Sequence, residues 1–163
     1  GVWSCARAAS ATVPLLRHAG ERHWAERALL VNSLYAKARE RFGQREIDWR
    51  TGRFVVLLVN HFYTPDYEAH DLVADIGLSA VIAQSLELTG KTITNGFADA
   101  DGCVFPALSS DIPVGMVVIA ELVGGVPTNL IFGAQDGLNL PASPQGEDWY
   151  VSWDDAFGGI FRL

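Results

Sequence analysis

The sequence predicts a mainly β fold, an antiparallel β-sandwich or barrel-like domain preceded by a short N-terminal amphipathic helix. Three observations predict it. After Arg53 the apolar residues fall into about six to eight short segments that are rich in β-branched and aromatic residues. Clusters of Gly, Pro, Ser, Asn and Asp separate these segments at roughly regular spacing. Only one segment has a clear helical periodicity.

The predicted helix lies within residues 32–43. Its apolar face is marked by residues at helical spacing, Leu34, Ala38 and Phe42. Asn32 or Ser33 can accept a hydrogen bond from a free N–H of the first turn and so cap the helix. Gly43 stands where a left-handed residue commonly ends a helix.

The first predicted strand, "FVVLLVN" (residues 54–60), is apolar throughout, which is typical of a strand covered on both faces. A polar and aromatic loop follows, with a helical turn near residues 68–74. Thr89-Gly90 separates two further apolar segments and predicts a hairpin between them. The remaining predicted strands are "GCVFPAL", "VGMVVIAELV", "NLIFGAQD" and "WYVSWD".

The C-terminal residues predict two strands joined by a turn. Side chains alternate along a strand, so Trp149, Val151 and Trp153 should share one face. Residues 154–159 contain Asp154, Asp155 and two glycines, which is turn chemistry. Residues 160–163 form the last predicted strand, and we expect it to pair within a sheet or with a partner chain, because an apolar edge strand left uncovered is adhesive.

Charge is distributed unevenly along the 163 residues, whose net charge is −7. Residues 1–53 hold ten of the twelve Lys and Arg and five of the nineteen Asp and Glu; the other 110 residues hold two bases and fourteen acids. The acidic body should repel nucleic acid, since phosphate binding needs a basic face. No apolar stretch reaches the length that spans a bilayer. We therefore expect neither a nucleic-acid nor a membrane partner.

Residues 1–30 differ from the rest in their Ala and Arg content. We expect an N-terminal extension there, either non-native read-through sequence or a loosely packed helix at residues 21–30, and a single β-rich domain from Val31 to Leu163. Cys5 and Cys103 lie far apart and form no metal-binding or disulfide pattern.

No residue pattern points to catalysis. His61 and His70 flank a loop with nearby carboxylates, but their spacing matches no metal motif, and a solvated loop is the favoured interpretation. Asp99 and Asp101 are interpreted as turn residues. Adjacent residues of an extended chain face opposite sides, so Asp154 and Asp155 do not form a catalytic pair. We predict no catalytic residue, no cofactor and no metal site. Four aromatic residues are candidate surface contacts for a ligand: Tyr63, Tyr67, Trp149 and Trp153.

Four segments carry a resemblance to a known family: "NSLYAKARERFGQREIDW", "VVLLVNHFYTPDYEAHDLVADI", "LTGKTITNGFADADGCVFPAL" and "LPASPQGEDWYVSWDDAFGGIFRL". In this order they resemble a family of small uncharacterised tailed-bacteriophage proteins that lie among virion structural genes. The resemblance covers about residues 31–163 and departs from the family pattern at residues 75–83. It implies a virion component and carries over no catalytic residue.

The resemblance implies a structural protein of the virion, a head decoration, neck or tail component that acts by protein–protein assembly and not as an enzyme. Its expected partners are other capsid or tail proteins and further copies of itself in a homo-oligomer or symmetric array, and its expected location is the virion, assembled in the host cytoplasm. The alternative is a carbohydrate- or receptor-binding β-sandwich module on the particle surface. A third hypothesis, an unrecognised hydrolase, has little support in the sequence.

Overall fold

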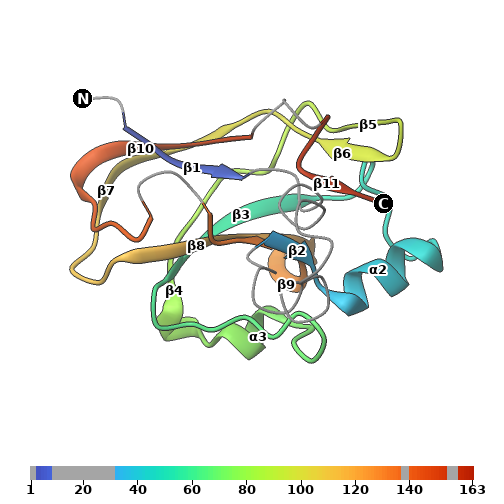
Figure 1. Ribbon diagram of the computed structural model, residues 1–163, viewed down its shortest axis with the longest axis horizontal. Helices are drawn as coiled ribbons and strands as arrows, with labels where there is room; N and C mark the ends of the chain where they lie inside the picture. Colours follow the sequence, from blue (N-terminus) through green and yellow to red (C-terminus); the bar gives the residue numbers. More distant parts are fainter. Residues whose placement is uncertain (1–2, 9–31, 137–139, 154–157) are drawn as a thin grey trace, which may run out of the picture.

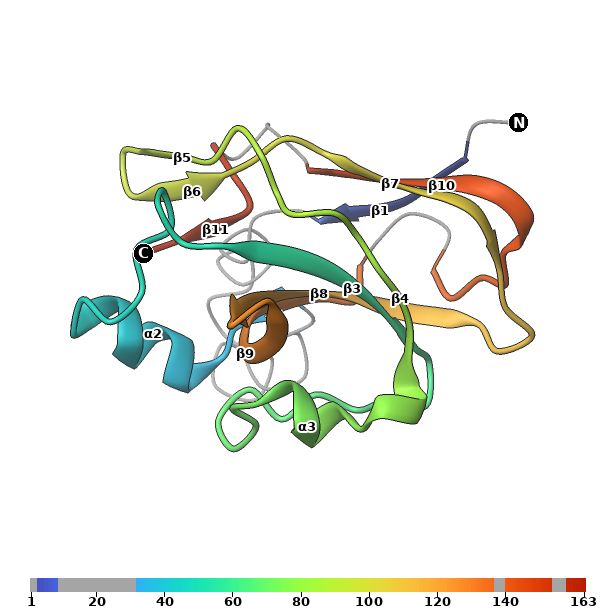
Figure 2. The same cartoon turned by 180° about the vertical axis from the view of Figure 1, so that it is seen from behind.

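The computed structural model describes residues 3–8, 32–136, 140–153 and 158–163, the first of these ranges by its backbone alone. Its strands form three sheets. Figures 1 and 2 show the two smaller sheets lying as one layer over the five-stranded sheet. The mainly β prediction is confirmed, and the described sheets do not close into a barrel.

The five-stranded sheet is antiparallel, and it supplies most of the core. Its strands, in spatial order, are β2 (Asn32–Leu34), β9 (Val126–Ala134), β8 (Val114–Val123), β3 (Phe54–Asn60) and β4 (Val81–Gln84). All seven residues of β3 are buried, as the sequence predicts for a strand covered on both faces. The overlying sheets cover one face, and the loop that carries α3 runs along the other.

The smaller sheets each have three strands. One contains β1 (Trp3–Ala8), β10 (Gln145–Trp153) and β7 (Cys103–Ser109), and the other contains β11 (Phe161–Arg162), β6 (Phe97–Asp99) and β5 (Thr92–Thr94). β1 pairs in parallel with β10, a contact that the sequence did not predict. The domain boundary near Val31 stays a prediction.

The helices are short: α2 (Ala36–Gly43), α3 (Val73–Ile76) and one 3₁₀ turn, η2 (Leu78–Ala80). The predicted caps of the first helix are wrong. Asn32 and Ser33 belong to β2, where the Asn32 side chain accepts a hydrogen bond from the Gln135 N–H at 3.1 Å. The helix begins after Tyr35, and the left-handed residue beyond its end is Arg45 with φ 62°, two positions after Gly43.

The predicted hairpin at Thr89-Gly90 is also wrong. Gly90 has a positive φ, but the strands on either side of it, β4 and β5, belong to different sheets. The hairpin joins β5 to β6 through Asn95 (φ 52°) and Gly96 (φ 81°). Positive φ at both central residues is the geometry that an Asn-Gly pair favours, because it matches the twist of the two strands.

The C-terminal prediction is confirmed where the structure describes it. Trp149, Val151 and Trp153 face the core, and β11 pairs with β6 inside a sheet. Asp154 and Asp155 lie outside the described residues. Ile160 and Phe161 are both fully buried, and the Phe161 ring joins the two layers, with centroids 5.1 Å from Trp49 and 5.5 Å from Phe132 of β9.

Substitution of Phe161 by Ala should lower the free energy of unfolding by about 3–5 kcal/mol, because it leaves a cavity between the layers. Leu163→Ala, two residues away on a side chain that is 46% exposed, should cost less than about 0.5 kcal/mol. Urea unfolding of both variants measures the difference. Equal stability of the two variants would show that the C-terminal strand does not hold the layers together.

Candidate functional site

The four aromatic residues predicted as ligand contacts do not form one exposed surface. Tyr67, Trp149 and Trp153 are 7%, 0% and 8% exposed and lie in the core. Tyr63 is half-buried, and its hydroxyl lies 3.1 Å from the hydroxyl of Tyr35 and 2.8 Å from Nδ1 of His70. The structure therefore brings none of these rings together as a platform for a ligand.

A hydrogen-bonded row of Tyr35, Tyr63 and His70 anchors the predicted histidine loop. The Asp66 N–H can only donate, so His70 Nδ1 is the acceptor at 3.2 Å, and its one lone pair is shared with the Tyr63 hydroxyl, which donates at 2.8 Å. The Tyr63 hydroxyl in turn accepts from Tyr35. Burial raises the pKa of both tyrosines, which keeps their hydroxyls protonated as this row requires.

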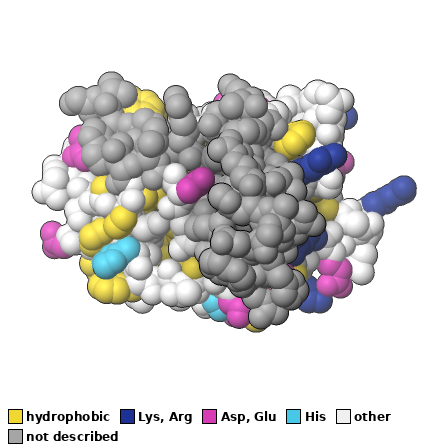
Figure 3. All heavy atoms as spheres, in the orientation of Figure 1, with side chains coloured by type: hydrophobic (Ala, Val, Ile, Leu, Met, Phe, Trp, Pro, Cys, Tyr) yellow, Lys and Arg dark blue, Asp and Glu magenta, His cyan; other side chains and the backbone are white. Residues whose placement is uncertain are grey.

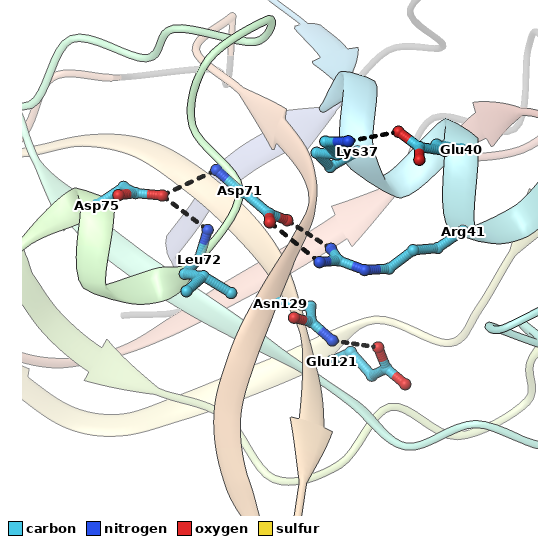
Figure 4. Close-up of polar contacts among 8 residues, drawn as sticks. All are labelled: Lys37, Glu40, Arg41, Asp71, Leu72, Asp75, Glu121 and Asn129. Atoms are coloured by element: carbon cyan, nitrogen blue, oxygen red, sulfur yellow. Dashed lines mark hydrogen bonds and ion pairs between the residues drawn. The ribbon is translucent and has the colours of Figure 1, made fainter.

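The carboxylates of the same loop hold the chain in place. Figure 4 shows Asp71 bound through both oxygens to the guanidinium of Arg41, at 2.5 and 3.0 Å. Asp75 accepts the backbone N–H groups of Leu72 and Asp71 at 2.8 and 2.9 Å, and these bonds lower the pKa of Asp75. The charged form of Asp75 therefore stabilises the fold at neutral pH, and this contribution is lost as pH falls through the lowered pKa.

No group of three or more His, Cys, Asp or Glu side chains is placed to hold a metal ion within the described part of the chain. The His61 ring lies beside the Phe62 ring in a tilted contact and does not approach His70 in any contact that the structure shows. Asp99 and Asp101 each use a backbone oxygen to accept from an indole, Trp49 at 3.0 Å and Trp153 at 3.2 Å. None of the helices within these residues is long and apolar enough to cross a membrane.

The strongest candidate for a binding site is a hollow of about 660 Å³ between α2, the loop after it, β5 and the C-terminus. We call it the basic groove. Its apolar lining is Leu34, Phe42, Ile47, Trp49, Ile93 and Leu163. Its charged lining is Arg39, Arg45, Arg50, Arg162 and Asp48. An apolar floor with a few charged groups at its edge is typical of a binding site.

Each arginine of the groove is positioned by a different element. Arg39 projects from α2, and Arg45 follows the helix end. Arg50 stands in a turn in which the Asp48 carboxylate accepts the backbone N–H groups of Arg50 and Thr51, at 2.8 and 3.3 Å. Arg162 alternates with the buried Phe161 along β11 and lies over the Phe97 ring. Four separate elements thus converge on one basic site.

Three of these arginines are without an acidic partner in the described residues. Arg39 lies 3.4 Å from Glu68, whereas Arg45, Arg50 and Arg162 form no ion pair there. Arg45 also occupies the left-handed region at φ 62°, where a non-glycine side chain is sterically unfavourable. Asn or Gly would fit this position better, so the backbone at position 45 does not explain the presence of Arg.

All the described basic side chains gather at this end of the molecule. Four of the twelve Lys and Arg lie among residues whose side chains the structure does not describe. The other eight lie on α2, on the loop from α2 to β3, beside β5 and on β11. In Figure 3 the Lys and Arg side chains that are visible on this face lie at the end of the molecule that carries α2 and the C-terminus. The charge asymmetry of the sequence was the only signal of this groove, and it did not identify the four arginines.

A second hollow, of about 440 Å³, is lined by Cys103, Val104, Tyr150 and the segment from Leu86 to Thr89. Among the side chains that the structure describes, Cys103 is the one free thiol, and burial raises its pKa to about 12. A nucleophilic cysteine needs a lowered pKa, because the thiolate is the reactive form. This hollow therefore lacks an activated thiol.

The thiol of Cys103 should react slowly with a disulfide reagent at pH 8, by roughly a thousandfold relative to free cysteine, because its thiolate fraction is reduced by that factor. The Cys5→Ser variant isolates Cys103, since the chain has two cysteines. The release of the coloured thiol product measures the rate. A rate close to that of free cysteine would contradict the buried, protonated thiol.

Replacement of Arg41 by Lys should lower the free energy of unfolding by about 1 kcal/mol, because an ammonium cannot form the two parallel hydrogen bonds to Asp71. The matched control is Arg39→Lys on the same helix, whose long and exposed contact with Glu68 should contribute less than about 0.5 kcal/mol. Thermal unfolding measures both. If the two variants lose the same stability, the bidentate pair does not hold the loop.

Comparisons with protein-family models, with curated proteins and with solved structures found no match to this chain.

Proposed function

We propose that the chain is a structural protein of a tailed-bacteriophage virion and acts by binding other virion proteins, not by catalysis. The observation that carries this proposal is the gathering of the described basic side chains around an apolar groove. A protein of net charge −7 that keeps unpaired arginines in one place has a surface suited to an acidic protein partner.

The sequence resemblance supports the virion setting of this proposal. The segment from Asn32 to Trp49, one of the four that resemble the phage family, supplies most of the groove: Leu34, Arg39, Phe42, Arg45 and Trp49. The segment that ends at Leu163 supplies Arg162 on the other side. Ile93 belongs to a third of these segments, so the groove is built mainly from three of the four segments on which the resemblance rests, which fits a binding role in the assembled particle.

The layered sheets suit a protein with this role. We infer that the two layers form a β-sandwich. Its packed core makes a rigid frame, and the ends of this frame present the binding surfaces. Ion pairs fix the loops to neighbouring parts of the chain: Asp71 binds Arg41 of α2, and Glu87 binds Arg53 before β3. Surfaces on a rigid frame lose little conformational entropy on binding, which favours assembly.

A carbohydrate- or receptor-binding module is the weaker proposal. It needs exposed aromatic rings, and three of the four candidates are buried. The exposed aromatic ring of Phe62 lacks the polar tip with which Tyr or Trp contacts sugars. We therefore favour the structural role, and propose that the chain is located in the virion, assembled in the host cytoplasm, with capsid or tail proteins and further copies of itself as partners.

Particles purified from a host that encodes the chain should contain it at a fixed copy number, measured by quantitative mass spectrometry. Replacement of Arg45 by Asn together with Arg50 by Gln should reduce that copy number at least tenfold, because both changes remove charge from the groove. The matched control, Lys37→Gln with Arg53→Gln, removes the same charge from the same end outside the groove.

Two results would overturn the proposal. One is a chain that accumulates in the cell but is absent from washed particles. The other is an enzymatic activity of the purified chain that survives removal of the groove charges.

A further inference from the structure

We propose that the basic groove binds the opposite end of a second copy of this chain, so that copies associate head to tail. This inference rests on the proposed function, because it names one partner of the same groove. The opposite end carries an exposed apolar and acidic surface, which we call the acidic tip and define as Phe62, Asp111 and Ile112.

The tip is built from two loops held side by side. The His61 N–H donates to the Pro113 carbonyl at 3.0 Å, which places Phe62 and Ile112 on adjacent turns. The Asn60 side chain accepts the Phe62 N–H at 3.0 Å, and the Ser110 hydroxyl oxygen accepts the Ile112 N–H at 3.2 Å. Both loops are therefore fixed by hydrogen bonds, although the Phe62 side chain is 72% exposed.

The chemistry of the tip complements that of the groove. An exposed phenyl ring and an isoleucine side chain need an apolar surface, and the groove offers Phe42, Ile93 and Leu163. Asp111 carries the charge opposite to that of Arg45, Arg50 and Arg162, and it forms no ion pair in the described residues. An aromatic anchor surrounded by complementary charge is a common arrangement at the centre of protein interfaces.

The two surfaces lie at opposite ends of the same strand. Phe54, the first residue of β3, packs on Trp49 of the groove, with centroids 4.7 Å apart. Asn60, the last residue of β3, binds the backbone of Phe62 in the tip. Seven residues of strand span roughly 20 Å. Figure 1 shows β3 running from the end near α2 toward the other end of the molecule.

This separation determines the kind of assembly. In the proposed head-to-tail contact the groove of one copy binds the tip of the next, so the contact is heterologous and leaves one free groove and one free tip in every complex. Such a contact continues until the copies close into a ring or extend as a filament. One groove and one tip make a smaller interface than the roughly 1,600 Å² of a standard complex, so the contact between free copies should be weak and concentration-dependent.

Sedimentation velocity of the full chain between 1 and 500 µM tests the proposal. We expect the weight-average mass to rise above the 17.7 kDa of one chain as concentration increases. Raising the salt from 50 to 500 mM should reverse the rise, because salt screens the charges. The groove variant, Arg45→Asn with Arg50→Gln, and the tip variant, Phe62→Ser with Asp111→Asn, should each weaken the association at least tenfold.

Matched controls separate this contact from a general effect of charge or apolar surface. Lys37→Gln with Arg53→Gln removes the same charge outside the groove, and Leu78→Ser removes a comparable exposed apolar side chain outside the tip. Both control proteins should associate like the natural chain. Arg45→Asn should also leave the melting temperature unchanged or raise it, because Asn tolerates the left-handed backbone better than Arg.

A mixture of the groove variant and the tip variant gives the most specific test. The groove of the tip variant and the tip of the groove variant are both intact, so the mixture should form one-to-one complexes that grow no further. A groove-on-groove contact related by two-fold symmetry predicts no such rescue, since each mixed pair would hold one defective groove and the tips would play no part.

Four outcomes would overturn the inference. The first two are a natural chain that stays monomeric at 500 µM and control variants that weaken association as much as the groove variant. The other two are a mixture without rescue and groove-dependent, salt-sensitive binding to duplex DNA in fluorescence anisotropy. The last outcome would assign the arginines to phosphate. Failure here with the chain present in particles would leave the proposed function standing, whereas absence from particles would overturn that function whatever the sedimentation result.

Discussion

The packing of Phe161 against Trp49 and Phe132 is the contact on which the rest of the structure depends. It joins three parts of the chain that are far apart in sequence: the C-terminal strand, the turn before β3 and the middle of β9. Trp49 extends the cluster to Phe54, and its indole N–H binds the Asp99 carbonyl at the end of β6. The two layers are therefore connected through one group of aromatic rings.

The same cluster forms the base of the candidate site. Trp49 is buried in the core beneath the groove, and Arg162 follows Phe161 on the last strand. Because residues alternate along a strand, burial of Phe161 directs Arg162 outward over Phe97. The position of Arg162 in the groove is thus a consequence of core packing.

The sequence predicted the features that depend on local pattern. The apolar run of β3, the alternation of Trp149, Val151 and Trp153, and the burial of the C-terminal strand all follow from the period of a strand and the cost of exposing apolar area. Predictions that depended on long-range pairing were wrong. Asn32 could cap a helix, yet its backbone pairs with β9 as part of β2, and its side chain accepts a hydrogen bond from the Gln135 N–H. Pairing of β2 with β9 satisfies backbone groups of both strands.

The groove could not be predicted from the sequence for a related reason. Its arginines are at positions 39, 45, 50 and 162, and only folding brings the last of these to the other three. The aromatic candidates were misleading because Trp149 and Trp153 lie at core-facing strand positions and Tyr67 is buried from a loop, and burial cannot be read from residue type alone. What the sequence did contain was the concentration of Lys and Arg in its first third.

Four of the edge strands, β7, β2, β4 and β5, have features that oppose pairing with another chain, which favours the ends of the molecule as its binding surfaces. β7 lies at an edge and carries Pro106, which has no N–H to donate, followed by Ala107 with φ 46°. The pairing of β7 with β10 shifts register twice, which distorts the edge further. The edge strands β2, β4 and β5 have only three or four residues each. A chain that assembles through these edges would need longer and flatter strands there, so we favour the unpaired arginines of the groove and the exposed Phe62 beyond the end of β3 as the contact surfaces.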